Sequence, residues 1–169
     1  MVWSAPLNLT FVPSADSLSF AGLSPTETSL PLAPHPGAFG VARKNHIHEG
    51  VDLYCAEGTP VYAVEPGRVV AVVPFTGTIA GSDWWHDTYA VLVEGETGVV
   101  VYGEITPGRV TGENIAAGDC IGHVKQVLKN DKGRPMAMLH LELYDHGTRD
   151  AVEWKNDTPR PRGLRDPTP

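Results

Sequence analysis

Apolar residues recur with a period of two in short runs between residues 51 and 145, and this feature constrains the fold most strongly. In the clearest run, 137–144, Leu139, Leu141 and Leu143 share one face, as alternate residues of a β-strand do. Glycine and proline separate the runs, which is typical of turns between short strands. Residues 124–130 fit a short helix and a strand equally well. The chain is therefore predicted to be all-β. The expected strands cover residues 51–54, 60–64, 68–73, 89–94, 99–102, 109–110, 120–124 and 137–144.

The distribution of proline predicts the domain organisation. Six of the 15 prolines lie in residues 1–36 and four in the last eleven residues, so only five fall between them. We expect a Pro/Ser-rich extended arm over 1–36, one domain over 37–158 and a Pro/Arg tail over 159–169. Spaced apolar residues predict that the arm packs onto the domain. These residues are Trp3, Leu7, Leu9, Phe11, Leu18 and Phe20.

Charge and hydropathy exclude two classes of partner. With 20 acidic and 13 basic residues, the formal charge is −7, which argues against nucleic acid as the main partner. No apolar run approaches 18 residues, so no transmembrane segment is expected. The N-terminus has neither the basic nor the uninterrupted apolar region of a signal peptide. The two cysteines, Cys55 and Cys120, are expected to be core residues rather than a disulfide framework.

Two histidines and one aspartate form a candidate metal site. His48 and Asp52 are four residues apart in a segment that is not helical, so both can reach one ion only if the chain bends between them. Gly50 would supply the backbone freedom for that bend. His140 lies on the face of its predicted strand opposite the leucines. Two histidines and a carboxylate suit a catalytic zinc site with an open fourth position.

These segments resemble the lysostaphin/LytM-type zinc metallopeptidases. The resemblance rests on the run from Phe39 to Val70, which includes His48-Glu49-Gly50-Val51-Asp52, and on Leu139-His140-Leu141-Glu142-Leu143-Tyr144. It covers about residues 37–169, which is most of the chain. It implies a compact antiparallel β-sandwich or barrel with one zinc ion in a groove, held by His48, Asp52 and His140. It also implies an endopeptidase acting on the peptides of bacterial cell walls.

The sequence departs from this family at both positions where a histidine usually assists catalysis. Met138 replaces the first histidine of the family's His-x-His strand, and Glu104 replaces the histidine of its Tyr-x-His-Leu segment. Three interpretations follow: a working peptidase with Glu104 as general base, a zinc-binding module that binds peptide or protein without hydrolysis, or a scaffold in which zinc is structural or absent. A carboxylate beside a zinc-activated water can act as a base, so the peptidase is the preferred interpretation.

Several further residues have alternative interpretations. Arg43 fits a substrate carboxylate or a structural ion pair, and Glu142 is expected to orient a neighbour rather than bind metal. Tyr102 and the insert 77–88, which carries two tryptophans, are candidates for the groove wall. His46 is expected in a solvent-exposed loop. A cell-wall substrate would imply periplasmic or extracellular action, although no export signal is evident.

Overall fold

The computed structural model describes residues 2–16, 25–133 and 135–168, and nearly all of its regular structure is β, which confirms the predicted class. Among these residues, one 3₁₀ turn, η2 (Thr78–Ala80), interrupts the strands. No helix in these residues is long and apolar enough to span a membrane. The strands are β1 (Thr10–Ser14), β2 (Glu27–Pro31), β3 (His46–Ile47), β4 (Val51–Tyr54), β5 (Pro60–Tyr62), β6 (Gly67–Thr76), β7 (Thr88–Gly95), β8 (Val99–Pro107), β9 (Asn114–Ile115), β10 (Cys120–Val124), β11 (Met138–Tyr144), β12 (Trp154–Lys155) and β13 (Leu164–Arg165).

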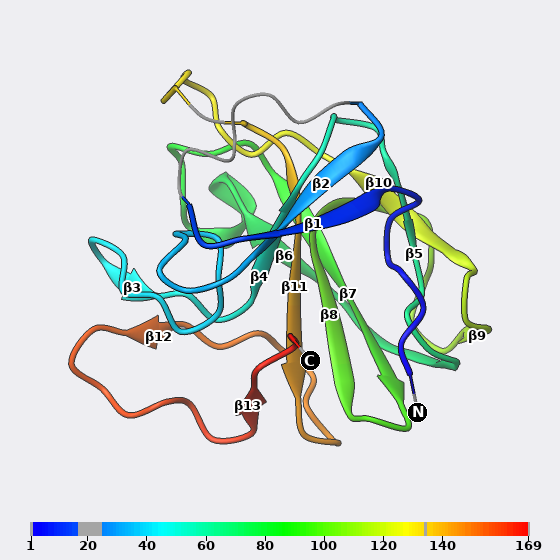
Figure 1. Cartoon of the computed structure of the whole chain (residues 1–169). Coiled ribbons are helices and arrows are strands. Elements are labelled where there is room, and N and C mark those ends of the chain that lie inside the picture. The colour runs from blue at the N-terminus through cyan, green and yellow to red at the C-terminus, as the bar shows by residue number, and fades with distance from the viewer. Residues whose placement is uncertain (1, 17–24, 134, 169) are drawn as a thin grey trace.

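The main sheet has the order β13-β11-β8-β7-β6-β9 and is not closed into a barrel (Figure 1). Its strand pairs are antiparallel, and β10 joins it by pairing with β5 and β8. Strand β4 pairs with the first half of β11, and β13 pairs with its last two residues. Central strand β11 therefore has neighbours along both edges, which fixes the direction of its side chains.

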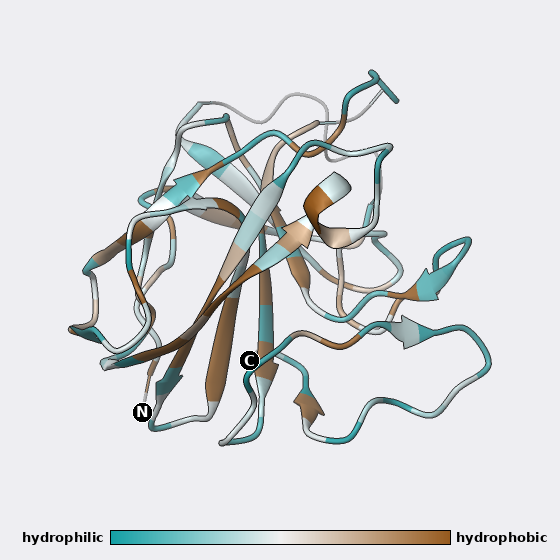
Figure 2. Cartoon of the chain, turned by 180° about the vertical axis from the view of Figure 1, so that it is seen from behind, coloured by the Kyte–Doolittle hydropathy of each residue, from teal (hydrophilic) through white to brown (hydrophobic). Residues whose placement is uncertain are grey.

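Alternation along the strands produces one apolar core and a second, smaller apolar face. Leu139, Leu141 and Leu143 of β11 lie in the main core, as the period of two predicted. The opposite face of the sheet carries another cluster, which contains Val101 and Tyr144. Figure 2 shows the apolar strands at the centre of the molecule and the hydrophilic loops around them.

The hairpin of β7 and β8 forms as the four-residue loop predicted, with the Gly95 amide donating to the Gly98 carbonyl at 2.9 Å. Strands β4 and β10 match their predicted ranges, whereas β6 and β8 extend further. Residues 109–110 are not a strand. Of the helix and the strand considered for 124–130, neither forms beyond Val124, the last residue of β10, where only isolated bridges at Gln126 and Leu128 follow. These differences arise because partner strands, rather than local pattern, decide where pairing ends.

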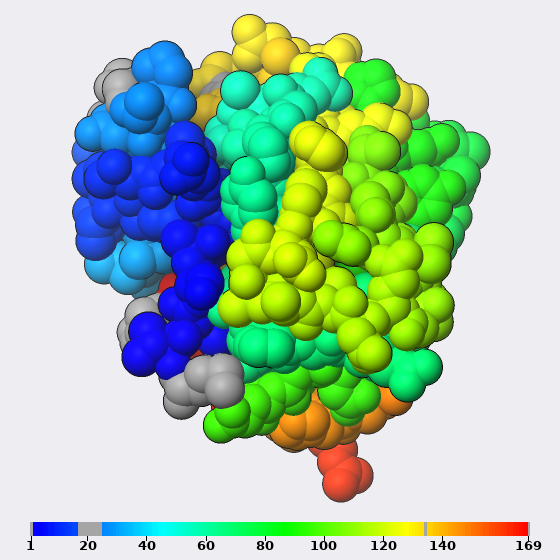
Figure 3. Space-filling view, turned by 90° about the vertical axis from the view of Figure 1, so that its right-hand side faces the viewer, coloured from blue at the N-terminus to red at the C-terminus, as the bar shows by residue number. Residues whose placement is uncertain are grey.

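The N-terminal arm packs on the domain, as its apolar residues predicted. Leu7 is completely buried in the main core, and the Trp3 indole donates to the Thr97 hydroxyl at 3.2 Å. Strands β1 and β2 form a small parallel sheet beside the domain, and Figure 3 shows this blue segment lying against the teal and yellow-green segments. Leu18 and Phe20 lie outside the described residues.

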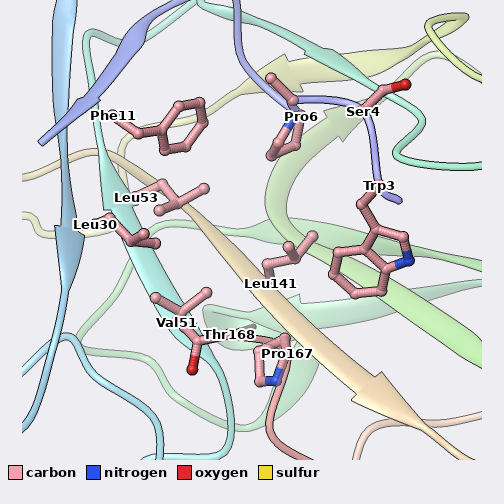
Figure 4. Close-up of a pocket in the computed structure, with 11 residues that line it drawn as sticks. Trp3, Ser4, Pro6, Phe11, Leu30, Val51, Leu53, Leu141, Pro167 and Thr168 are labelled. Atoms are coloured by element: carbon pink, nitrogen blue, oxygen red, sulfur yellow. The ribbon is translucent and has the colours of Figure 1, made fainter. Parts of the chain in front are cut away.

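The arm and the C-terminal segment meet over the face of β4 and β11 that carries Val51, Leu53 and Leu141. Together they line an apolar hollow of about 250 Å³, into which Val51, Leu53 and Leu141 point (Figure 4). Leu164 of β13, within the predicted tail, is buried in the smaller apolar cluster of the main sheet. Because Asp52 and His140 alternate with the hollow's residues, their side chains point to the other side of the sheet.

Candidate metal centre

Pairing between β4 and β11 brings two of the three candidate ligands together. Asp52 lies directly opposite His140 in the register, and His48 reaches the same point from the loop before β4. The Asp52 Oδ1 atom is 2.8 Å from His140 Nδ1 and 3.1 Å from His48 Nε2. His48 Nε2 and His140 Nδ1 are 3.2 Å apart. All three predicted ligands therefore present one donor atom each to the same small volume, as a shared metal ion requires.

The bend between His48 and Asp52 depends on Gly50 for a different reason from the one predicted. Gly50 has no left-handed φ; instead, its α-carbon lies against β11. A Cβ atom there would come within 2.3 Å of the Leu141 carbonyl oxygen and 2.9 Å of His140 Nε2. Close approach of the two backbones, rather than conformational freedom, makes glycine necessary at this position.

Hydrogen bonds of the outer ring nitrogens orient both imidazoles. His48 Nδ1 donates to the Ala38 carbonyl at 3.0 Å, because a carbonyl oxygen can only accept. His140 Nε2 faces Glu142 Oε1 at 2.8 Å, which makes Glu142 the orienting carboxylate that the sequence predicted. In the neutral rings, the inner nitrogens therefore carry lone pairs that point at each other and at the Asp52 carboxylate.

Arg43 fixes the remaining oxygen of Asp52. Its Nη2 atom lies 2.6 Å from Asp52 Oδ2 and also donates to the Pro36 carbonyl. Burial alone would raise the pKa of Asp52, but the charges of His48 and Arg43 hold it well below its usual range. Of the two roles considered for Arg43, the structure displays the ion pair. Asp52 is thus kept ionised, with a single oxygen directed at the histidines.

The donor set fits a divalent metal ion. His48, Asp52 and His140 are exposed by 1%, 2% and 6%, so water does not separate their converging lone pairs. Only a proton or a cation relieves the resulting repulsion, and the pKa of His140 is raised by its hydrogen bonds to Asp52 and Glu142 although burial acts against it. Two imidazole nitrogens and one carboxylate oxygen are the ligands of a zinc site that keeps an open position.

Glu104 lies beside this group on an irregular part of β8. A shift in register between β7 and β8 inserts Gly103 and Glu104 opposite one residue, and Glu104 has a left-handed φ of 62°. A non-glycine residue there costs about 1–3 kcal/mol, a strain that often accompanies function. Its Oε2 atom is buried without a hydrogen-bond partner among the described residues. Burial raises the pKa of Glu104 to about 8, and the negative charge of Asp52 acts in the same direction.

Apolar side chains occupy the other positions next to His140. Met138 lies on the same face of β11 and is 8% exposed. Its thioether has no proton to transfer at this position, where the family usually has histidine. The Phe75 ring of β6 lies 5.4 Å from the His140 ring, centroid to centroid. Gly103 makes room for it, because a Cβ atom there would approach the Phe75 ring within 2.6 Å. No sequence signal identified Phe75, since its contact with His140 depends on the register of the strands.

The structure places other predicted residues away from the metal centre. Tyr102 is completely buried in the core and accepts a hydrogen bond from the Val64 amide, so its prediction as a groove residue is wrong. His46 is half-buried, 3.8 Å from Glu49, and does not belong to the metal group. The free cysteines Cys55 and Cys120 are half-buried rather than fully in the core.

Replacing the orienting carboxylate should weaken metal binding. Glu142→Gln keeps the shape of the side chain but removes the charge that holds the His140 Nε2 proton. Loss of such a partner typically lowers metal affinity by about 10–100-fold. Competition with a fluorescent chelator measures this change, with the exposed Glu96→Gln as control. Equal affinity in both variants would contradict an orienting role.

Ionisation of Glu104 should destabilise the metal-free protein. The folded-state pKa of about 8 exceeds the ordinary value of 4.5, so the stability that the protonated carboxyl contributes is complete below pH 4.5 and is lost as the pH rises towards 8. Glu104→Gln cannot ionise and should therefore exceed the wild type at pH 9 by more than about 1 kcal/mol. Urea unfolding in the presence of a chelator measures the difference, which should vanish near pH 4. A constant difference across that range would exclude this cause.

Comparison with known proteins gives a family match and several structural likenesses. The model of peptidase family M23 matches residues 46–152. Csd3 of Helicobacter pylori aligns with 94% of this chain and 36% of that chain, at 18% identity and a TM-score of 0.50. The catalytic domain of the antimicrobial peptidase lysostaphin from Staphylococcus simulans aligns with 63% of this chain and 74% of that domain, at 19% identity and 0.46.

A third likeness is to a putative M23 peptidase of Pseudomonas aeruginosa, over 89% of this chain and 55% of that one, at 17% identity and a TM-score of 0.42. The chain spans 65% of CbpA from L. salivarius and only about a third of Csd3. No curated protein matches the sequence. At 18% identity, the likeness to Csd3 shows a shared fold and no more.

Proposed function

Because the chain belongs to peptidase family M23, we propose that it is a zinc-dependent metalloendopeptidase that cleaves peptide bonds of bacterial cell-wall peptidoglycan. The observation that carries the proposal is the convergence of His48 Nε2, Asp52 Oδ1 and His140 Nδ1 in a buried site. The proposed substrate places its action in the periplasm or outside the cell.

His48, Asp52 and His140 are the residues that would hold zinc. When bound, zinc supplies Lewis-acid chemistry, lowering the pKa of water and polarising a carbonyl oxygen. The protein contributes the orientation of the ligands: Ala38 and Glu142 hold the outer ring nitrogens, and Arg43 holds the outer oxygen of Asp52. This arrangement leaves each ligand with a single atom directed inward.

Glu104 is the proposed general base. It is near enough for the charges of Asp52 and His140 to act on it, and its buried Oε2 atom has no competing partner in the described chain. A pKa near the working pH suits a group that must accept and then release a proton. In this proposal Glu104 takes a proton from the attacking water and returns it to the leaving amine.

Loss of both usual histidines favours a slow enzyme. Met138 cannot donate a hydrogen bond to the developing oxyanion, and one missing donor typically costs about 10²–10³ in rate. The same substitution favours a second candidate, a zinc module that binds peptide without hydrolysing it.

Incubation of the zinc-loaded protein with purified peptidoglycan and with a glycine-rich peptide distinguishes the two candidates. Release of new amino termini, abolished by a chelator and restored by zinc, is expected for the peptidase. Absence of cleavage by the wild type and by a Met138→His, Glu104→His variant would exclude the peptidase and leave the binding module.

A further inference from the structure

A second polar site lies on the face of the sheet that carries the metal centre. Arg68 of β6 and Glu94 of β7 are directly opposite in the register, and both line a hollow of about 370 Å³. Arg149, from the segment between β11 and β12, closes another side, and Thr111 and Gly112 complete the wall. None of these residues belongs to the metal centre.

The charges in this hollow leave a positive excess. Glu94 is already satisfied, because its Oε1 atom accepts from the Gly147 amide at 2.7 Å and its Oε2 atom lies 3.2 Å from Arg149. Arg68 is exposed and forms no ion pair within the described residues. The hollow therefore contains two guanidinium groups and one carboxylate, which leaves one positive charge unbalanced in a protein whose formal charge is −7. An anion is the ligand that this combination favours.

A row of half-buried apolar residues joins the hollow to the metal centre. Phe75, which contacts the His140 ring, and Val70, which lines the hollow, pack on the same apolar cluster of the sheet, together with Ala71 and Val73 between them. At about 3.3 Å per residue, the seven steps along β6 from Phe75 to Arg68 come to at most roughly 23 Å, and the two bulges of this strand shorten the path towards about 20 Å. An extended peptide of about six residues spans that length.

We propose that the Arg68–Arg149 hollow is a subsite for a carboxylate of the substrate, so that the protein selects extended peptides with an acidic group about six residues from the bond at the metal centre. This proposal rests on the proposed function, which makes a peptide the substrate at the metal centre. The apolar row would contact the middle of the peptide, and the arginines would fix its charged end.

Calorimetry on the full chain, zinc-loaded and carrying Glu104→Gln to prevent turnover, tests this subsite. The probes are N-acetyl-hexaglycine with a free carboxylate, N-succinyl-hexaglycine amide for the opposite direction, and the neutral N-acetyl-hexaglycine amide. One charged probe should bind about three- to tenfold more tightly than the neutral one, and this preference should shrink between about 0.02 M and 0.5 M salt.

Arg68→Ala should remove the preference, Arg68→Lys should retain part of it, and Arg160→Ala, which removes an exposed charge outside the hollow, should leave it unchanged. Equal binding of all three probes, or a preference that survives Arg68→Ala combined with Arg149→Ala, would overturn the subsite. Binding is measured without turnover, so an inactive wild type with an Arg68-dependent preference would reject the peptidase and keep the subsite.

Discussion

His140→Ala is expected to reduce bound zinc to well below one ion per chain and to abolish hydrolysis. The substitution removes the Nδ1 atom that lies 2.8 Å from Asp52 Oδ1, and it leaves only two protein ligands. A catalytic zinc site needs three, so the loss should exceed the 10–100-fold effect of removing an outer partner. Elemental analysis after dialysis against buffered zinc measures the ion, and cleavage of peptidoglycan measures the activity.

Two controls separate loss of the ion from loss of the fold. His123→Ala removes an exposed histidine of β10 and should keep both zinc and activity. His140→Asn retains a polar side chain at the buried position, so near-native circular dichroism with little zinc would locate the effect in the site. Full zinc occupancy in His140→Ala would refute the assignment of these three ligands.

Glu104→Gln is expected to lower kcat by about 10²–10⁴-fold while zinc content stays at the wild-type level. Glutamine has nearly the same shape as glutamate and is subject to the same left-handed backbone strain at this position, but it cannot accept a proton from water. Since Glu104 is not one of the three residues whose donor atoms converge in the candidate metal site, replacing it should not release the ion. Initial rates on a glycine-rich peptide, with zinc measured in the same samples, provide the comparison.

The pH profile supplies a readout that a purely structural role would not change. In the wild type, kcat should fall on the acidic side as Glu104 becomes protonated, and that limb should be missing in Glu104→Gln. The neighbouring Thr106→Ala, exposed on the same strand, is the matched control. Unchanged turnover in Glu104→Gln would remove Glu104 from the reaction.

Strand periodicity and residue type were enough to predict much of the fold and of the candidate site. The strict alternation in 137–144 predicted a strand with leucines on one face and His140 on the other, and β11 has this arrangement. Local chemistry of this kind is readable because neighbouring residues in a strand must point to opposite faces. For the same reason, Met138 could be placed beside the ligand and identified as a missing proton donor.

Contacts between segments that are distant in the sequence could not be predicted from the sequence alone. Asp52 and His140 are 88 residues apart, and only the register of β4 against β11 places the His140 side chain opposite the carboxylate. The same pairing explains why Gly50 is required for close approach. Phe75 instead reaches the ligand through the pairing of β6 with β7, of β7 with β8 and of β8 with β11. Tyr102 was predicted to line the groove, but its position on β8 directs its side chain into the core instead.

The sequence by itself determined the all-β class, which follows from a local period of two. It also indicated His48, Asp52 and His140 as candidate metal ligands, through their side-chain chemistry and the family resemblance. Only the tertiary structure decided that one atom of each ligand points inward, that a strained Glu104 lies beside them, and that Arg68 and Arg149 share a hollow on the same face. These features depend on strand pairing, in which a slip of one residue would turn every side chain to the opposite face.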